Sequence, residues 1–205
     1  EHANSYYAAS VNEVTEYPRL QENVSVDVCI VGAGFTGISA ALTLAERGYS
    51  VAVVEANRVG WGASGRNGGQ VINGMSGLDK VRSRNPDVAD SVFWDLKWGG
   101  NDLIRERIEK YDIQCDLKDG FLEVAAKPSH VSYLESYYEE RASREFPYDY
   151  ELWDKEKTRD MLGTDAFHGG FVCYRDGHLH PLNLCIGEAR AAHDLGVQIF
   201  ERSPV

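Results

Sequence analysis

The sequence lacks any long apolar run, since no uninterrupted stretch approaches the roughly 20 residues that a membrane-spanning helix requires. It also lacks an excess of basic residues, because 21 Lys and Arg stand against 32 Asp and Glu, for a net charge of -11. A surface of that charge repels polyanions. We therefore expect no membrane partner and no nucleic-acid partner.

Cysteine is sparse, and its spacing fits neither a disulfide framework nor a zinc site. The four cysteines are Cys29, Cys115, Cys173 and Cys185, with no CxxC pair among them. We expect four buried or half-buried thiols in a reducing compartment. No signal or transit segment is visible, which favours the cytoplasm. His178 and His180 lie two residues apart without a third or fourth ligand nearby, so we expect a structural role for them and no metal site.

The first regular pattern is a strand, a helix and a second strand. Residues 26–31 form a short β-branched run that predicts a buried strand of a parallel sheet. Residues 35–47 change to helical periodicity and are followed by Gly48, a typical residue just after a helix end. Residues 51–54 are apolar throughout and predict a second buried strand. We expect an α/β fold with a Rossmann-like, right-handed βαβ unit.

The turn between the first strand and the helix reads Gly32-Ala33-Gly34-Phe35-Thr36-Gly37, a G-x-G-x-x-G motif in its required context. Gly32 permits the tight turn, Gly34 lets a pyrophosphate approach the backbone, and Gly37 lets the helix pack against the strand. Glu55 ends the second strand, 55 − 32 = 23 positions after the first glycine, where an acid accepts hydrogen bonds from a ribose. The pattern predicts an adenine dinucleotide, either FAD or NAD.

The remaining pattern predicts an excursion from this unit and a return to it. A glycine-rich loop at 56–77 precedes a helix over 87–111 that Gly99-Gly100 would break or kink, and Ser129 would cap a helix over 129–145. Strands are expected at 121–126, 170–174 and 197–201, with Pro181 opening a helix over 181–195. The predicted division is an N-terminal arm at 1–24, a dinucleotide-binding part at 25–112, an inserted α+β substrate-domain segment at 113–175 and a return at 176–205.

The loop after Glu55 carries a family resemblance. It contains Gly62-Ala63-Ser64-Gly65-Arg66-Asn67-Gly68-Gly69-Gln70, and with the G-x-G-x-x-G turn and Glu55 it resembles the D-amino-acid-oxidase-type flavoproteins. Members of this family are FAD-dependent oxidases of amines or amino acids. The resemblance implies that Ser64 contacts phosphate or ribityl oxygens and that residues 66–70 lie along the flavin. The same loop argues against a nicotinamide-dependent dehydrogenase, which has no need of it.

The resemblance assigns a set of residues to FAD. The set is Gly32, Gly34, Phe35, Thr36, Gly37, Glu55, Ala56, Arg58, Gly62, Ala63, Ser64, Arg66, Asn67, Gly68, Gly69, Gln70 and Val205. Some family members bind flavin covalently through a histidine of this loop, but residues 63–70 contain neither histidine nor cysteine. We therefore expect non-covalent FAD.

The resemblance also implies an activity, which is the oxidation of a small amine to an imine or aldehyde with reoxidation by oxygen. Three further segments narrow the resemblance to a branch that oxidises a glutamylated polyamine: Ser5-Tyr6-Tyr7-Ala8-Ala9-Ser10, Arg105-Glu106-Arg107-Ile108 and Gly177-His178-Leu179-His180-Pro181-Leu182-Asn183-Leu184. Family members continue well past the position of Val205, so we expect a missing C-terminal half as partner. Two alternatives stay open: a non-catalytic FAD-binding fragment, and an oxidase of another amine or amino acid. No catalytic acid or base is assigned within 1–205.

Overall fold

The structure is a computed structural model that describes residues 1–74, 77–142 and 149–205. Two compact units make up the chain. Unit 1 comprises Glu1–Gly69, Gly74–Leu117 and Leu179–Val205, and unit 2 comprises Gln70–Asn73 and Lys118–His178. The chain thus leaves unit 1 twice, and the short stretch Gln70–Asn73 groups with the second unit although the sequence pattern placed it with the first.

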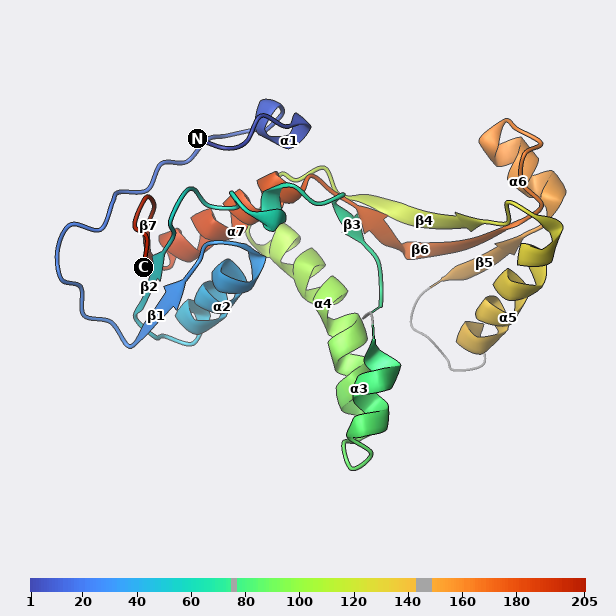
Figure 1. The fold of residues 1–205 in the computed structure, drawn as a ribbon, viewed down its shortest axis with the longest axis horizontal. Helices are drawn as coiled ribbons and strands as arrows, with labels where there is room; N and C mark the ends of the chain where they lie inside the picture. The colour runs from blue at the N-terminus through green and yellow to red at the C-terminus, as the bar shows by residue number, and fades with distance from the viewer. Residues whose placement is uncertain (75–76, 143–148) are drawn as a thin grey trace. The chain divides into compact units, whose positions relative to one another are not determined.

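Unit 1 is built on a parallel sheet in the order β1-β2-β7. Its strands are β1 (Val28–Val31), β2 (Val51–Val54) and β7 (Gln198–Phe200), with Val28 opposite Val51 and Ala52 opposite Gln198. The helices α2 (Phe35–Glu46) and α7 (Pro181–Asp194) pack against each other beside this sheet (Figure 1). The βαβ unit is therefore present, and it has the predicted parallel strands.

One apolar core holds unit 1 together. It joins Ile38 and Leu42 of α2, Val53 of the central strand, and Leu182 and Ala189 of α7. All of these are completely or almost completely buried. The central strand β2 is buried at each of its four positions, as its unbroken apolar run predicts.

The edge strand β1 departs from the prediction of a buried strand. Its burial alternates, with Cys29 and Val31 exposed, and Val31 is 68% accessible. The reason is its position: among the described residues β1 pairs with β2 alone, so one of its sides has no neighbouring strand. Cys29 also corrects the expectation of four buried thiols, since only Cys115, Cys173 and Cys185 are buried.

The other helices of unit 1 are α1 (Tyr6–Ala9), α3 (Leu78–Arg84) and α4 (Asp90–Lys110). The sequence pattern gave no sign of α1 or α3. Helix α4 runs unbroken through Gly99 and Gly100, so the predicted break there is wrong. None of the helices described in 1–74, 77–142 and 149–205 is long and apolar enough to cross a membrane.

Unit 2 is an antiparallel sheet centred on β6 (Gly170–His178). Strand β4 (Lys118–Val124) pairs along β6, while β3 (Gln70–Val71) and β5 (Tyr150–Trp153) pair with different stretches of it. Next to the sheet lie α5 (Val131–Ala142) and α6 (Lys155–Leu162).

Local chemistry explains where the unit 2 helices begin. Ser129 lies inside the short 3-10 helix η2 (Pro128–His130), and α5 begins only at Val131, so Ser129 is not its N-cap as expected. The last three residues of the predicted helix, 143–145, lie outside the described residues. Helix α6, which the pattern missed, begins after Asp154, whose side chain accepts a hydrogen bond from the Lys157 N–H at 2.8 Å.

Candidate dinucleotide site

The turn at residues 32–37 connects β1 to α2 and packs against its own helix. The Gly32 N–H donates to the Val54 carbonyl at 2.8 Å, which fixes the turn between the two strands. A Cβ added to Gly37 would stand 2.0 Å from the Gly32 carbonyl oxygen, so only glycine lets the first helical turn approach this closely. Gly34 is the N-cap and offers no side-chain acceptor, which leaves first-turn N–H groups directed out of the helix end.

Glu55 bridges the carboxyl ends of β1 and β2. One carboxylate oxygen accepts the Ala33 N–H at 2.8 Å, and the other accepts the Asn57 N–H at 2.8 Å. Each oxygen retains a second lone pair, so the group can also accept from ligand hydroxyls. This position, next to the glycine turn, fits an acid that binds a ribose.

The loop that carries the family resemblance closes directly on the helix terminus. Within the 3-10 helix η1 (Ala63–Gly65), the Ser64 Oγ accepts the Phe35 N–H at 2.9 Å. A Cβ on Gly34 would stand 2.8 Å from the same oxygen. Because the Ser64 hydroxyl is the acceptor in this bond, its own hydrogen remains able to donate to a phosphate or hydroxyl oxygen.

The Asn67 side chain stabilises the loop through hydrogen bonds to its backbone. Its Nδ2 donates to the carbonyls of Ala63 at 3.1 Å and Ser64 at 3.0 Å, while its Oδ1 accepts the Gly69 N–H at 2.8 Å. These bonds hold residues 63–69 as one turn. The side chain of Asn67 is therefore engaged in shaping the loop.

Gly69 joins the loop to the start of α7. Its carbonyl accepts the Leu179 N–H at 2.8 Å, and its φ is +69°, a backbone conformation that favours glycine. A Cβ at this position would lie 2.0 Å from the Leu179 carbonyl oxygen. Leu179 is thus a partner of the site that sequence reasoning did not single out.

The buried floor beneath the loop also comes from α7. Leu182 and Cys185 lie under Gly60 and Gly65, and the Cys185 thiol is 3.7 Å from the Ala33 carbonyl oxygen. Burial raises the pKa of the Cys185 thiol well above its ordinary value, so it stays protonated and packs as a small apolar group.

Arg66 lies against Trp61 at the exposed side of the loop. Its Nε donates to the Trp61 carbonyl at 2.8 Å, and its guanidinium carbon is 4.2 Å from the centre of the indole ring. This cation–π contact holds the arginine over the loop. A contact between Arg66 and flavin stays a prediction.

Arg58 is placed differently from the other predicted residues, because it is buried and its guanidinium is bound by the protein. Its Nε is 2.7 Å from Glu201, its Nη2 donates to the Thr15 carbonyl at 2.5 Å, and Nη1 is 3.3 Å from Glu16. Glu201 also accepts the Val59 N–H at 2.8 Å. The Arg58 side chain therefore fastens the N-terminal arm to the rest of unit 1, a role that the sequence around Arg58 does not signal.

The remaining predicted residues are mostly exposed. Thr36, Ala56, Gly62, Ala63 and Gly68 have accessible surfaces, and a Cβ on Gly62 or Gly68 would meet no atom within 4 Å. Gln70 belongs to β3 of unit 2, and Val205 is 93% exposed. The structure thus brings the glycine turn, Glu55 and the Ser64 loop together, with an open side formed by Gly62 and Gly68.

The donor and acceptor set fits a dinucleotide. Unsatisfied N–H groups at a helix N-terminus attract phosphates, Glu55 supplies acceptors for ribose hydroxyls, and Ser64 supplies a hydroxyl donor. No bulky side chain fills the open side above Gly62 and Gly68. The site can therefore hold FAD along the turn and the loop.

Comparison with known proteins agrees with this arrangement. A family model described as FAD dependent oxidoreductase matches residues 27–205. A probable oxidoreductase OrdL of Haemophilus influenzae is 47% identical over 207 residues, and a gamma-glutamylputrescine oxidoreductase of Escherichia coli is 42% identical over 207 residues. Each alignment covers 100% of this chain and 48% of the relative, so the chain spans about half the length of these curated relatives.

Solved structures share the fold. An L-amino acid deaminase of Proteus vulgaris superposes with a TM-score of 0.74 at 24% identity, over 93% of this chain and 43% of that one. A glycine oxidase of Bacillus cereus superposes with a TM-score of 0.66 at 22% identity, over 88% and 47%. These structural matches confirm the predicted α/β fold, and the family model that matches residues 27–205 confirms the family resemblance.

Proposed function

The chain belongs to the FAD dependent oxidoreductase family, and from this premise we propose that it is the FAD-binding part of an enzyme that oxidises a small amine. The proposed substrate is gamma-glutamylputrescine or a similar amine, and the proposed reaction yields an imine or aldehyde. The FAD is bound without a covalent link, and the protein works in the cytoplasm with the rest of its polypeptide, which corresponds to the other half of the relatives.

The observation that carries this proposal is the closure of the Ser64 loop on the start of α2. The 2.9 Å bond from the Phe35 N–H to Ser64 Oγ and the 2.8 Å bond from the Ala33 N–H to Glu55 bring three separate segments to one helix end. A nicotinamide site needs the glycine turn and the acid, but not the loop. The loop therefore favours FAD over NAD.

When bound, FAD would supply the redox chemistry, which is that of a two-electron acceptor for the carbon next to a neutral amine that oxygen can reoxidise. The residues of this chain bind and orient it. Glu55 accepts hydrogen bonds from the ribose, the start of α2 attracts the pyrophosphate, and Ser64 donates to an oxygen beside it. Because Asn67 and Gly69 hold the loop through hydrogen bonds within the protein, little ordering is needed on binding.

The gamma-glutamylputrescine assignment is supported by the 42% identical Escherichia coli relative. The 47% identical Haemophilus influenzae relative, by contrast, is named only as a probable oxidoreductase. An oxidase of another amine or amino acid is the second candidate function, because the glycine oxidase and L-amino acid deaminase share this fold.

An anaerobic visible spectrum tests both the cofactor and the substrate. The natural full-length protein, saturated with FAD, is recorded before and after addition of gamma-glutamylputrescine. We expect a flavin spectrum that bleaches on addition. A flavin spectrum that stays unchanged, but bleaches with another amine or an amino acid, would replace the substrate and keep the family chemistry. Folded protein without flavin, even after added FAD, would contradict the proposal as a whole.

NAD competition is the matched control. We expect excess NAD to leave FAD bound, because the Ser64 loop is built for the longer flavin cofactor. Displacement of FAD by NAD would favour a nicotinamide enzyme.

A further inference from the structure

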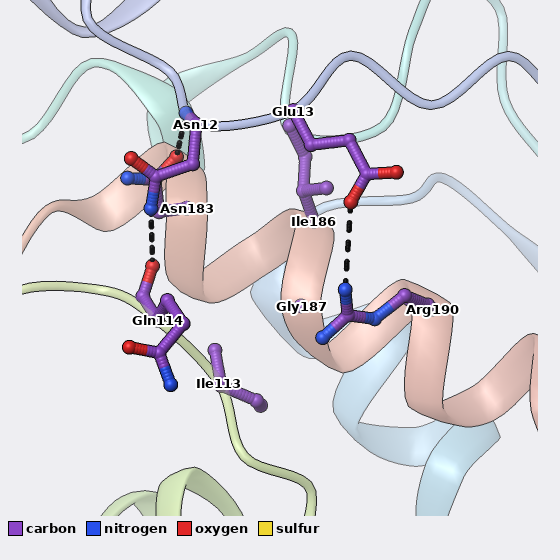
Figure 2. A pocket seen from close by; sticks show the side chains of 8 residues that line it. All are labelled: Asn12, Glu13, Ile113, Gln114, Asn183, Ile186, Gly187 and Arg190. Carbon is purple, nitrogen blue, oxygen red and sulfur yellow. Dashed lines mark hydrogen bonds and ion pairs between the residues drawn. The ribbon is translucent and has the colours of Figure 1, made fainter.

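A cavity lies in unit 1 beneath the N-terminal arm, and none of the residues assigned to FAD lines it. It has a volume of about 290 Å³ and is bounded by the arm, by residues 113–114 and by one face of α7 (Figure 2). A share of about 30 Å³ per water molecule makes this space equal to roughly ten waters. The cavity is therefore large enough for a small metabolite of about ten non-hydrogen atoms.

The floor of the cavity is apolar and buried. Ile113 is 3% exposed and Ile186 is 8% exposed. A Cβ on Gly187 would stand 2.3 Å from the Ile113 side chain, so this glycine allows α7 and residue 113 to come together and form the floor. Such a surface accepts methylene groups and offers no partner to a charge.

One end of the cavity carries one charge of each sign. The Arg190 guanidinium lies 3.4 Å from the Glu13 carboxylate, and their side chains are 44% and 62% exposed. Among the described residues, this is the one ion pair of Arg190, whose guanidinium has five N–H donors. The pair thus offers donors for a carboxylate and an acceptor for an ammonium at the same place, on the open side of the cavity.

The other end carries carboxamides. The Asn12 N–H donates to Asn183 Oδ1 at 3.0 Å, and the Asn12 Nδ2 donates to the main-chain carbonyl of Gln114 at 2.7 Å. Figure 2 shows these three residues on one side of the cavity and Glu13 and Arg190 on the other, with Ile113 and Gly187 between them. These bonds hold the arm in place as the cavity's wall.

We propose that this cavity binds a free α-amino acid with an uncharged polar side chain. Its carboxylate pairs with Arg190, its ammonium pairs with Glu13, its methylenes lie on Ile113, and its polar side-chain end meets the carboxamides. A dianion is repelled by Glu13, and a diamine is repelled by Arg190. L-Glutamine has ten non-hydrogen atoms, which matches the size of the cavity. Its charged end matches Arg190 and Glu13, and its amide end matches the carboxamides.

Calorimetric titration of the natural full-length protein, saturated with FAD, tests this site with L-glutamine as the probe. Two analogues separate its charges: glutaramate lacks the ammonium and 4-aminobutanamide lacks the carboxylate. We expect saturable binding of L-glutamine and binding about tenfold weaker for each analogue, because each loses a hydrogen bond to a charged group. Absence of binding at millimolar L-glutamine, or equal binding of all three compounds, overturns the proposal.

Variants locate the binding event. Arg190→Gln and Glu13→Gln should each weaken L-glutamine binding about tenfold. Arg159→Gln removes an exposed arginine of α6, which is paired with Asp160, and should leave the affinity unchanged. The flavin spectrum distinguishes this site from the substrate site. If L-glutamine bleaches the flavin, and binds Arg190→Gln as tightly as the unmodified protein, it occupies the substrate site and the proposal is wrong.

Discussion

At the scale of single residues, Gly37 is one of the positions that tolerate a side chain least. Because a Cβ there would stand 2.0 Å from the Gly32 carbonyl oxygen, the turn or the helix start must move in Gly37→Ala. We expect a loss of about 3 kcal/mol in the free energy of unfolding, at the upper end for overpacking, together with loss of FAD binding. Urea denaturation and the bound flavin absorbance measure the two effects.

Gly99→Ala is the matched control, since it is also a glycine-to-alanine change within a helix. A Cβ on Gly99 meets nothing within 4 Å, and helix α4 continues on both sides. This variant should be more stable by about 0.5–1 kcal/mol, because alanine favours a helix interior. If both variants had the same stability and FAD binding, steric contact at the turn would not explain why a glycine is required at position 37.

Glu55 is the second residue whose role can be isolated. Its carboxylate accepts two backbone N–H groups at 2.8 Å each, and ribose hydroxyls would add to these. Glu55→Gln keeps the size but replaces one acceptor oxygen with a donor. We expect FAD affinity to fall about tenfold or more, as for a lost hydrogen bond to a charged group. Fluorescence quenching on FAD titration measures the change, and an unaltered affinity would exclude Glu55 from the ribose.

At the scale of elements, sequence pattern is reliable where the determinants are local. The strand, helix and second strand between residues 28 and 54 were predicted from runs of consecutive residues, and the structure confirms all three. The Gly99-Gly100 break was wrong because tertiary packing outweighs a propensity cost of about 1 kcal/mol per glycine. Phe93 and Trp98, which precede the two glycines in α4, are buried and anchor that part of the helix.

Partners distant in sequence could not be predicted. Arg58 binds Glu201, 143 positions away by 201 − 58, and Gly69 binds Leu179. Helix α6 was missed for a different reason. Asp154 and Gly163 mark its ends, but its eight residues carry too few apolar side chains to show a helical period.

The start of α7 should depend on pH through His180. Its Nδ1 accepts the Asn183 N–H at 3.1 Å and caps the helix, and Nε2 is 3.2 Å from Ser10 Oγ. Burial lowers the pKa of His180 below its ordinary value of 6.5, against smaller opposing effects of a backbone hydrogen bond and then of the Asp116 charge. The unfolded chain therefore binds the proton more readily, so the stabilisation present above pH 6.5 is lost as the pH falls toward the lowered value.

His180→Asn tests this dependence, because asparagine can cap a helix but does not titrate. The urea midpoint should fall less between pH 7.5 and pH 5.5, values on either side of the ordinary pKa of about 6.5, in the variant than in the unmodified protein. His130→Asn changes an exposed histidine and should reproduce the unmodified pH dependence. An identical slope for His180→Asn would remove His180 as the cause.

At the scale of the whole molecule, one buried ion pair joins three helices of unit 1. Arg107 of α4 is 3.0 Å from Glu188 of α7, with both side chains almost fully buried, and it donates to Ser39 and Thr43 of α2 at 2.7 and 2.8 Å. Arg107→Met leaves Glu188 buried without its partner and should cost about 3–5 kcal/mol. The double variant with Glu188→Leu should recover part of that loss, measured by urea denaturation. Lys110→Met, which removes an exposed ion pair with Glu46, should have a much smaller effect.

The division into two units predicts where FAD changes the stability of the backbone. A ligand that binds the folded state stabilises the elements that form its site. In the full-length protein, hydrogen exchange with and without FAD should show the largest gain in protection at the first turn of α2 and in residues 63–69. The gain along β2 should be smaller, because its residues are buried and should exchange slowly even without FAD. Strands β4 and β6 form their own antiparallel ladder in unit 2, and most of the assigned residues lie in unit 1. Their amides should gain least. A gain in β4 and β6 equal to that in α2 would mean that FAD stabilises the chain as one cooperative body, and would contradict this prediction.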